Sequence, residues 1–161
     1  MSEATEIKNA INLKTTRFAG LCLATCGIYF NIWIYNNTKK IEEITKTKIF
    51  DTGSIISLLS IYGWGAFLVT NPIPTIQSIG GPIILCSYAM YAIWAFKARK
   101  AIQEYALNEH KLDLRMNPFY TFIFNAFYIN YCINDLPELK RKQTILSSEQ
   151  FKSTSAGQPN T

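Results

Sequence analysis

Charged and apolar positions are separated into long blocks along this chain. Three stretches carry no Asp, Glu, Lys or Arg, over residues 18–38, 52–96 and 116–134, and every charged residue lies outside them. A helix needs about 20 mostly apolar residues to cross the hydrocarbon core of a bilayer. The pattern therefore predicts an all-α membrane protein and argues against a soluble globule, a disordered chain or a disulfide scaffold.

The middle stretch is too long for one helix, because each helical residue adds only about 1.5 Å. It contains Asn71-Pro72-Ile73-Pro74 and, further on, Gly80-Gly81-Pro82. Proline removes a backbone donor and restricts the residue before it, so we expect residues 70–81 to form an uncharged connection. The sequence thus predicts about four transmembrane or partly re-entrant helices in two tandem pairs, over residues 18–35, 54–69, 82–96 and 117–133.

Polar segments surround this predicted membrane domain of residues 18–134. Residues 1–17 are too polar for a cleaved signal peptide, so the first apolar segment is interpreted as a retained signal-anchor helix. Ile7 and Ile11 share one helical face there, which is compatible with a short interfacial helix. Residues 135–161 form a polar tail, and its end, from Ser153, has the composition of a disordered segment.

The linkers 36–53 and 97–115 are basic and amphipathic. The second fits either a helix on the membrane surface or an extension of the preceding helix into water.

Basic residues predict the orientation of the central helix pair. Lys and Arg number three before residue 18, four in 36–53, none in 70–81, five in 97–115 and four after residue 134. Since basic loops stay on the cytoplasmic side, the connection 70–81 is expected outside. If segments 18–35 and 117–133 also span, both termini lie outside and the bias is weak. If those segments are re-entrant or interfacial, all 16 basic residues stay inside.

An internal repeat is visible when the two halves of the chain are aligned. The segment from Ile32 to Glu43 aligns with the segment from Ile93 to Glu104. Ile, Trp, Lys, Ile and Glu are identical in the two segments, and a Tyr in the first aligns with a Phe in the second. Aromatic and basic residues at a helix end are also typical of a membrane interface, so convergence is the alternative to duplication. The predicted interface anchors are Trp33, Tyr35, Lys39, Lys40, Trp94, Phe96, Lys97 and Lys100. Their predicted partners are the lipid bilayer and anionic lipid headgroups.

The same residues carry a family resemblance. Thr25-Cys26-Gly27-Ile28-Tyr29, followed by Ile32-Trp33-Ile34-Tyr35 and a Lys pair, resembles a bacterial membrane family of unknown function. A related pattern follows at Tyr91–Lys97 and Asn117-Pro118-Phe119-Tyr120. This chain departs from the pattern at Asn36-Asn37, where a Lys is expected. The resemblance implies a small multi-pass protein of the bacterial inner membrane, and it assigns no catalytic residues.

The sequence offers little chemistry. No ionisable Asp, Glu, Lys, Arg or His lies inside an apolar segment, where such residues mark proton relays and ion pathways. His110 lies in a charged segment, so we expect a solvated side chain rather than a catalytic base. The four cysteines are interpreted as apolar side chains rather than metal ligands. We therefore expect no enzyme, no cofactor and no metal.

Asn31, Asn125 and Asn130 are the best candidates for a polar site within the membrane. Amides in hydrocarbon require partners. We expect hydrogen bonds between helices, with a solute path as the alternative. The net charge of +5 is assigned to lipid phosphates rather than to nucleic acid.

Two functions remain open. The first is a non-enzymatic scaffold, assembly factor or accessory subunit that binds another membrane protein or itself. The alternative is a small oligomeric channel or transporter with an Asn- and Ser-lined path. We expect flux into liposomes only for the second.

Overall fold

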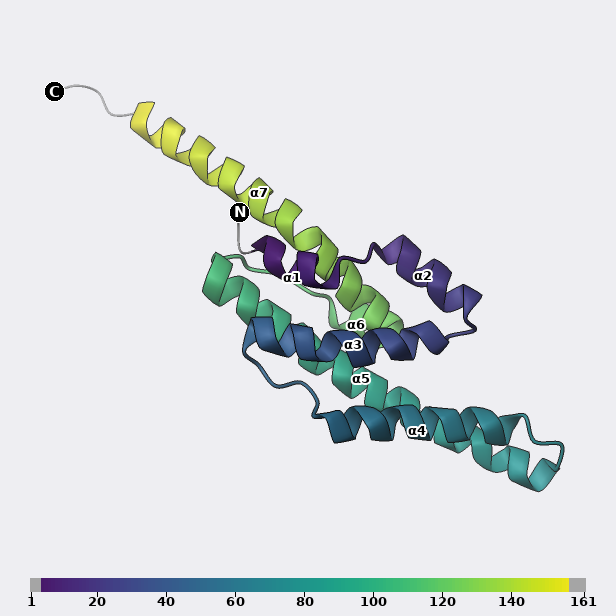
Figure 1. The fold of residues 1–161 in the computed structure, drawn as a ribbon. Coiled ribbons are helices and arrows are strands. Elements are labelled where there is room, and N and C mark those ends of the chain that lie inside the picture. The colour runs from purple at the N-terminus through teal and green to yellow at the C-terminus, as the bar shows by residue number, and fades with distance from the viewer. Residues whose placement is uncertain (1–3, 157–161) are drawn as a thin grey trace.

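A computed structural model describes residues 4–156 of the chain, and the surroundings of side chains for residues 6–148. Within residues 4–156 the regular structure is helical throughout (Figure 1). The helices are α1 (Ala4–Ile11), α2 (Thr15–Ala24), α3 (Ile28–Thr45), α4 (Thr52–Val69), α5 (Pro74–His110), α6 (Pro118–Phe124) and α7 (Ala126–Ala156). The prediction of an all-α fold is confirmed for this part of the chain.

Helices α4 and α5 form a long hairpin. Asp51 caps the N-terminus of α4 by accepting a hydrogen bond from the Ser54 amide, at 3.2 Å. A Cβ on Gly65 would stand 2.8 Å from Ile84, so the absence of a side chain there lets the two helices approach closely. Both helices are long and apolar enough to cross a membrane, judged by length and composition.

The connection between α4 and α5 is shorter than the predicted 70–81. Helix α5 begins at Pro74, where the missing amide hydrogen costs nothing, and it continues through Pro82. The turn therefore contains only residues 70–73, and the Asn71 side chain closes it by accepting from the Ile73 amide at 3.0 Å. Helix α5 also continues past Phe96 to His110, which agrees with the interpretation of 97–115 as a helical extension.

The prediction of four spanning helices is not supported, because segments 18–35 and 117–133 are both broken. In the first, Cys26 and Gly27 have positive φ angles of 49° and 88° between α2 and α3. The Thr25 hydroxyl donates to the Leu21 carbonyl and accepts from the Tyr29 amide, so it caps both helices across the turn. The second segment breaks at Asn125, between α6 and α7. Neither segment contains a single apolar helix of spanning length.

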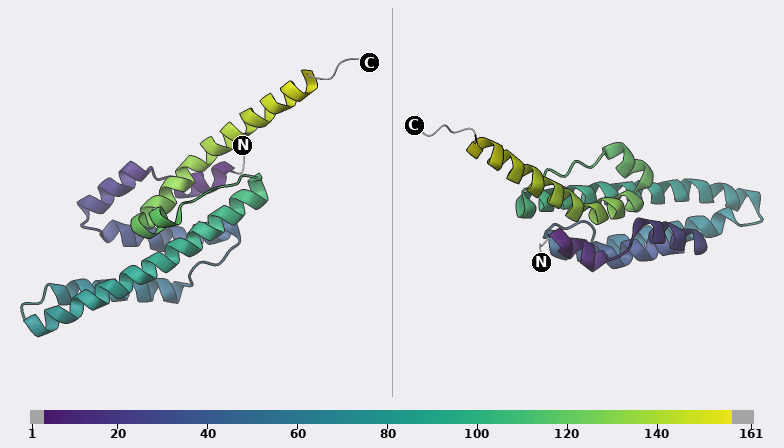
Figure 2. Two further views of the ribbon diagram at one scale, coloured as in Figure 1. Left: turned by 180° about the vertical axis from the view of Figure 1, so that it is seen from behind. Right: turned by 90° about the horizontal axis from the view of Figure 1, so that it is seen from above.

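The two broken segments lie beside the hairpin and point in the same direction. In both views of Figure 2, the turn between α2 and α3, the turn between α6 and α7, and the loop between α4 and α5 lie toward one end of the molecule. The hairpin loop reaches furthest. Helix α1, the end of α5 and the second half of α7 lie at the other end. The broken segments therefore form two short helical hairpins that accompany α4–α5 along part of its length.

The core lies where α3 crosses α5. Trp33 and Trp94 meet edge to face there, with ring centroids 6.1 Å apart, and Phe18 of α2 stacks on Trp33 at 4.9 Å. Helix α1 packs against α3 and α7, so Ile7 and Ile11 are buried in the core instead of facing a membrane surface. The apolar face that the sequence shows in residues 1–17 is thus covered by the protein itself.

The C-terminal tail begins as part of α7. This helix runs through Pro137 to Ala156. The disorder predicted for the segment from Ser153 stays a prediction. Residues 157–161 of that segment lie outside the described residues.

Candidate functional site

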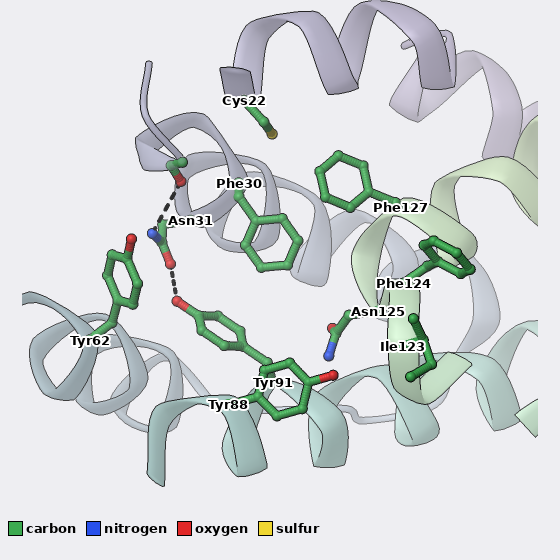
Figure 3. Close-up of a pocket in the computed structure, with 11 residues that line it drawn as sticks. Cys22, Phe30, Asn31, Tyr62, Tyr88, Tyr91, Ile123, Phe124, Asn125 and Phe127 are labelled. Carbon is green, nitrogen blue, oxygen red and sulfur yellow. Dashed lines mark hydrogen bonds between the residues drawn. The ribbon is translucent and has the colours of Figure 1, made fainter. Parts of the chain in front are cut away.

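A cavity of about 320 Å³ lies where the two short hairpins meet α4 and α5 (Figure 3). Gly27 places the α2–α3 turn beside α4, since a Cβ there would stand 3.6 Å from the Tyr62 hydroxyl. Tyr88 of α5 donates a hydrogen bond to the Phe122 carbonyl of α6 at 2.9 Å. Because Tyr62 lies near the middle of α4, the cavity is at mid-height of the long hairpin. Its lining residues are Cys22, Gly27, Phe30, Asn31, Tyr62, Tyr88, Tyr91, Ile123, Phe124, Asn125 and Phe127.

Aromatic rings hold the walls of this cavity together. Phe30 of α3 meets Tyr91 of α5 edge to face, with centroids 5.3 Å apart. Phe127 of α7 lies 5.5 Å from Phe30 and 4.6 Å from Phe18. The α2–α3 hairpin and the α6–α7 hairpin are therefore joined through packed rings beside the cavity.

Both polar atoms of the Asn31 side chain have hydrogen-bond partners at one side of the cavity. Its side-chain carbonyl accepts a hydrogen bond from the Tyr91 hydroxyl, and its amide group donates to the Gly27 carbonyl at 3.5 Å. These bonds tie the α2–α3 turn to α5. The predicted contact between helices is thus present for Asn31.

Asn125 is different, because its amide is buried without a partner. The residue is 4% exposed, and neither its Nδ2 nor its Oδ1 has a hydrogen bond. In Figure 3 its side chain points toward Tyr88 and Tyr91 across the cavity. An unsatisfied buried polar group costs about 1–3 kcal/mol, and this residue presents two such atoms.

The backbone of Asn125 is also unfavourable. Its φ of 49° and ψ of −123° belong to a conformation that suits glycine. A non-glycine residue held in such a region costs about 1–3 kcal/mol, and such costs concentrate at functional sites. Asn125 therefore combines a strained backbone with an unpaired amide at the wall of a cavity.

Asn130 lies outside the cavity and serves as a tether. Its amide nitrogen donates to the Leu13 carbonyl at 3.1 Å and to the Thr15 hydroxyl at 3.2 Å. Asn134 donates to the same Leu13 carbonyl at 2.9 Å. Helix α7 therefore holds the junction between α1 and α2, and only two of the three predicted Asn residues come together at the cavity.

The two tryptophans predicted as interface anchors are buried in the core. Trp94 is 0% exposed and Trp33 is 2% exposed, so neither indole can reach a lipid headgroup. The Trp94 Nε1 donates to the Thr38 hydroxyl at 2.9 Å. These residues pair across the α3–α5 crossing because packing against each other removes more apolar area from solvent than an exposed position would.

The other predicted anchors are more exposed. Tyr35 and Phe96 are partly open to the surroundings. Lys40 donates to the Ala10 carbonyl at 3.1 Å, and Lys97 donates to the Ile49 carbonyl at 3.2 Å while lying over the Phe50 ring. The remaining two basic anchors are Lys100, which pairs with Glu104 at 3.7 Å, and Lys39, which is exposed. Headgroup contact by these residues stays a prediction.

The cavity is suited to neutral ligands. Its lining contains no charged side chain. Among the described residues, no group of three or more His, Cys, Asp or Glu is placed to hold a metal ion. His110 is buried at the end of α5, edge to face with Tyr105, and lies apart from the cavity. The arrangement supports binding of an apolar molecule.

The sequence did not identify the tyrosines of this site. Tyr62, Tyr88 and Tyr91 lie in charge-free helices, where aromatic residues are common, and only the fold brings them together. Two local signals were available for the backbone around the site, though not for the tyrosines: Thr25-Cys26-Gly27 has the composition of a turn, and Asn117-Pro118 has that of a helix start. Asn117 indeed caps α6 by accepting from the Phe119 amide at 2.8 Å.

Residues 14–104 match the protein family described as Domain of unknown function (DUF4234). The matched stretch contains α2, α3, α4 and most of α5, and it ends before α6 and α7. No curated protein and no solved structure matches the chain. The resemblance to a family of unknown function is confirmed for this stretch.

Proposed function

The chain belongs to the DUF4234 family, and we propose that it is a non-enzymatic integral membrane protein that serves as a scaffold, assembly factor or accessory subunit for another membrane protein. The proposal includes a multi-pass arrangement in a bacterial inner membrane. In it α4 and α5 cross the bilayer, and the α2–α3 and α6–α7 hairpins enter from the cytoplasmic side without crossing.

The exposed surface of the two short hairpins supports this arrangement. Leu23 of α2 is 83% exposed and Phe119 of α6 is 64% exposed, together with other apolar neighbours. Water disfavours such a concentration of apolar side chains, and a bilayer accommodates it. With the hairpins re-entrant, all 16 basic residues stay on one side, where Lys and Arg meet anionic headgroups.

The outward face of α4 supports the proposal that a partner protein binds there. Only 17% of this helix is buried, and the covered side is the one that packs on α5. On the opposite side, a groove of about 410 Å³ is lined by Ser60, Gly63, Trp64 and Phe67. Gly63 leaves open space where a side chain would be. Small residues beside aromatic ridges let a second transmembrane helix approach closely, so this face fits a helix of a partner protein.

Filling the groove tests the proposal. Gly63→Leu adds a side chain to the groove, and Gly81→Leu adds the same side chain at a position on α5 that also has open space. We expect native mass spectrometry of the protein extracted in mild detergent to show a defined complex for wild type and Gly81→Leu, and loss of the partner for Gly63→Leu. A complex that survives equally in both variants would contradict the proposed face.

A channel or transporter is the second candidate, and the location of the cavity favours it. Asn31 and Asn125 lie at mid-height of α4–α5, beside two broken helices, and such breaks form substrate sites in transporters. This function requires several copies around a shared path, since the described part of the chain contains two helices of spanning character. Solute flux into liposomes above that of empty vesicles would favour it over the scaffold role.

A further inference from the structure

We propose that the cavity at Asn125 binds a neutral, planar, ring-shaped molecule that is dissolved in the bilayer and carries a carbonyl-type oxygen. The proposal rests on the membrane placement given above but is independent of the scaffold role. Three features of the cavity support it: its aromatic lining, its unpaired amide and its connection to the lipid-facing side.

The lining selects for shape and charge. Five aromatic rings face the cavity, from Phe30, Tyr88, Tyr91, Phe124 and Phe127, beside the ring of Tyr62. Flat rings pack favourably on aromatic faces and edges. A volume of about 320 Å³ lies at the lower end of ligand-pocket sizes, which fits a ring system better than a two-chain lipid. The absence of charged side chains from the lining excludes a charged ligand, because an ion there would be unpaired.

The Asn125 amide supplies the polar contact. Its Nδ2 has no acceptor within the described part of the chain, and a ligand carbonyl would provide one. Tyr62 also lines the cavity, and its hydroxyl can donate a second hydrogen bond. The two donors stand at different sides of the cavity, so a ligand with two oxygens could engage both.

A groove provides the route from the bilayer. A second cavity of about 510 Å³ lies between α3 and α4, lined by Ile28, Ile32, Tyr35, Leu59 and Gly63. It shares Asn31 and Tyr62 with the aromatic cavity. A membrane-dissolved molecule can therefore enter sideways between α3 and α4. The amide atoms of Asn125 are covered by neighbouring side chains, so a ligand reaches them when one of these side chains turns aside.

Two matched probes separate shape from hydrogen bonding. Fluorenone is planar and has one carbonyl oxygen, and fluorene has the same rings with a methylene in its place. We would measure saturable binding by calorimetry with the full chain in nanodiscs, after subtracting empty nanodiscs. We expect fluorenone to bind about five- to tenfold more tightly than fluorene, which corresponds to one hydrogen bond.

Two variants assign that preference to the site. Asn125→Gly removes the amide while suiting the φ of 49°, so its Tm should equal or exceed that of wild type and its preference for fluorenone should disappear. Tyr62→Phe keeps the shape of the cavity, and Tyr131→Phe makes the same change at an exposed residue outside it. With anthraquinone, which is planar and has two carbonyl oxygens, we expect weaker binding only for Tyr62→Phe.

Each outcome bears on the proposal. Absence of saturable fluorenone binding to wild type, equal affinity for the two probes, or an unchanged preference in Asn125→Gly would overturn it. Should Asn125→Gly fail to fold, the comparison of Tyr62→Phe with Tyr131→Phe decides the question. Phe67→Ala changes the outward groove of α4 at a residue that lines neither the aromatic cavity nor its entry, so loss of the partner with unchanged fluorenone binding in this variant would separate the two proposals.

Discussion

The indole of Trp94 has a single polar atom, and one hydroxyl satisfies it. Trp94 is completely buried, and its Nε1 donates to Thr38, whose own hydroxyl donates to the Ile34 carbonyl at 2.6 Å. The neighbouring Trp33 has no such partner for its Nε1. The pair therefore has one satisfied and one unsatisfied indole, and Thr38 is the residue that determines the difference.

Thr38→Val should destabilise the protein by about 1–3 kcal/mol. The substitution keeps the shape of the side chain and leaves the Trp94 N–H buried without an acceptor. Thr38→Ser retains the hydroxyl and serves as the control. Unfolding by titration with SDS in mixed micelles measures both. A Val variant as stable as the Ser variant would mean that the hydrogen bond contributes little at the α3–α5 crossing.

At the scale of single residues, the sequence predicted which polar side chains line the cavity, but it did not predict the environment of the two tryptophans. It identified Asn31 and Asn125 because amides in apolar segments need partners, and both line the cavity. It placed Trp33 and Trp94 at a membrane interface because their neighbours along the chain are basic. A local pattern cannot distinguish an indole that faces headgroups from one that faces a second indole far away along the chain, since that contact exists only after α3 crosses α5.

At the scale of elements, the turns determine the fold. The charge-free run 18–38 has the composition of one spanning helix, yet the turn from Thr25 to Gly27 divides it into two helices. The motif that carries the family resemblance is this turn rather than a helix end. Helix α5 shows the reverse case, because Gly80, Gly81 and Pro82 have the composition of a turn and lie within a continuous helix. Packing against α4 supplies the stability that the local sequence lacks.

The ring contacts between α3 and α5 join residues from the two halves of the proposed duplication. Trp33 and Trp94 occupy equivalent positions of the proposed repeat, and their rings are in contact. Phe30 and Tyr91 stand just before the two aligned segments at the same offset, and their rings are also in contact. Equivalent residues meet in this way where two related helices cross near an axis of symmetry. The similarity is confined to α3 and the matching part of α5, because residues 54–69 form one helix whereas 118–133 are broken.

Two adjacent glycines of α5 should respond oppositely to alanine. A Cβ on Gly80 would stand 2.6 Å from the Val69 backbone nitrogen and 3.0 Å from the Gly65 carbonyl oxygen, whereas a Cβ on Gly81 has open space. Gly80→Ala must push α4 and α5 apart, so we expect a loss of about 1–3 kcal/mol. Gly81→Ala should be neutral or stabilising by up to about 1 kcal/mol, because alanine favours helix.

The same SDS titration measures the two alanine variants. Equal behaviour would contradict the close approach of the two helices at this end of the hairpin. A comparison between neighbours in one helix also removes differences in helix propensity and in depth.

At the scale of the whole molecule, the direction of the turns separates the uncharged turns from the basic segments. The α2–α3 turn, the α6–α7 turn and the loop at residues 70–73 lie toward the same end, while the basic segments lie away from it (Figure 2). Composition alone did not determine how many segments cross the bilayer, because four straight spans and two spans with re-entrant segments have the same apolar runs. The breaks in the outer segments favour the second arrangement.

Labelling of single cysteines tests that arrangement. In a parent in which Cys22, Cys26, Cys86 and Cys132 are replaced by Ser, a new cysteine is introduced in turn at exposed positions. We expect a membrane-impermeant maleimide to label Pro72→Cys in intact cells, because the uncharged loop lies outside. Asn9→Cys, Lys100→Cys and Ser147→Cys should be labelled only after permeabilisation, since the basic segments remain in the cytoplasm.

The two positions beyond the outer segments, Asn9 and Ser147, decide between the arrangements. If the segments around Thr25 and Asn125 crossed the bilayer, Asn9→Cys and Ser147→Cys would react from outside while Lys100→Cys would still require permeabilisation. Lys100 therefore serves as the internal control, because both arrangements place it inside. Labelling of Asn9→Cys in intact cells would overturn the re-entrant arrangement, and with it the placement of the aromatic cavity at the depth of Tyr62, because the α2–α3 turn could then no longer lie at mid-height of α4.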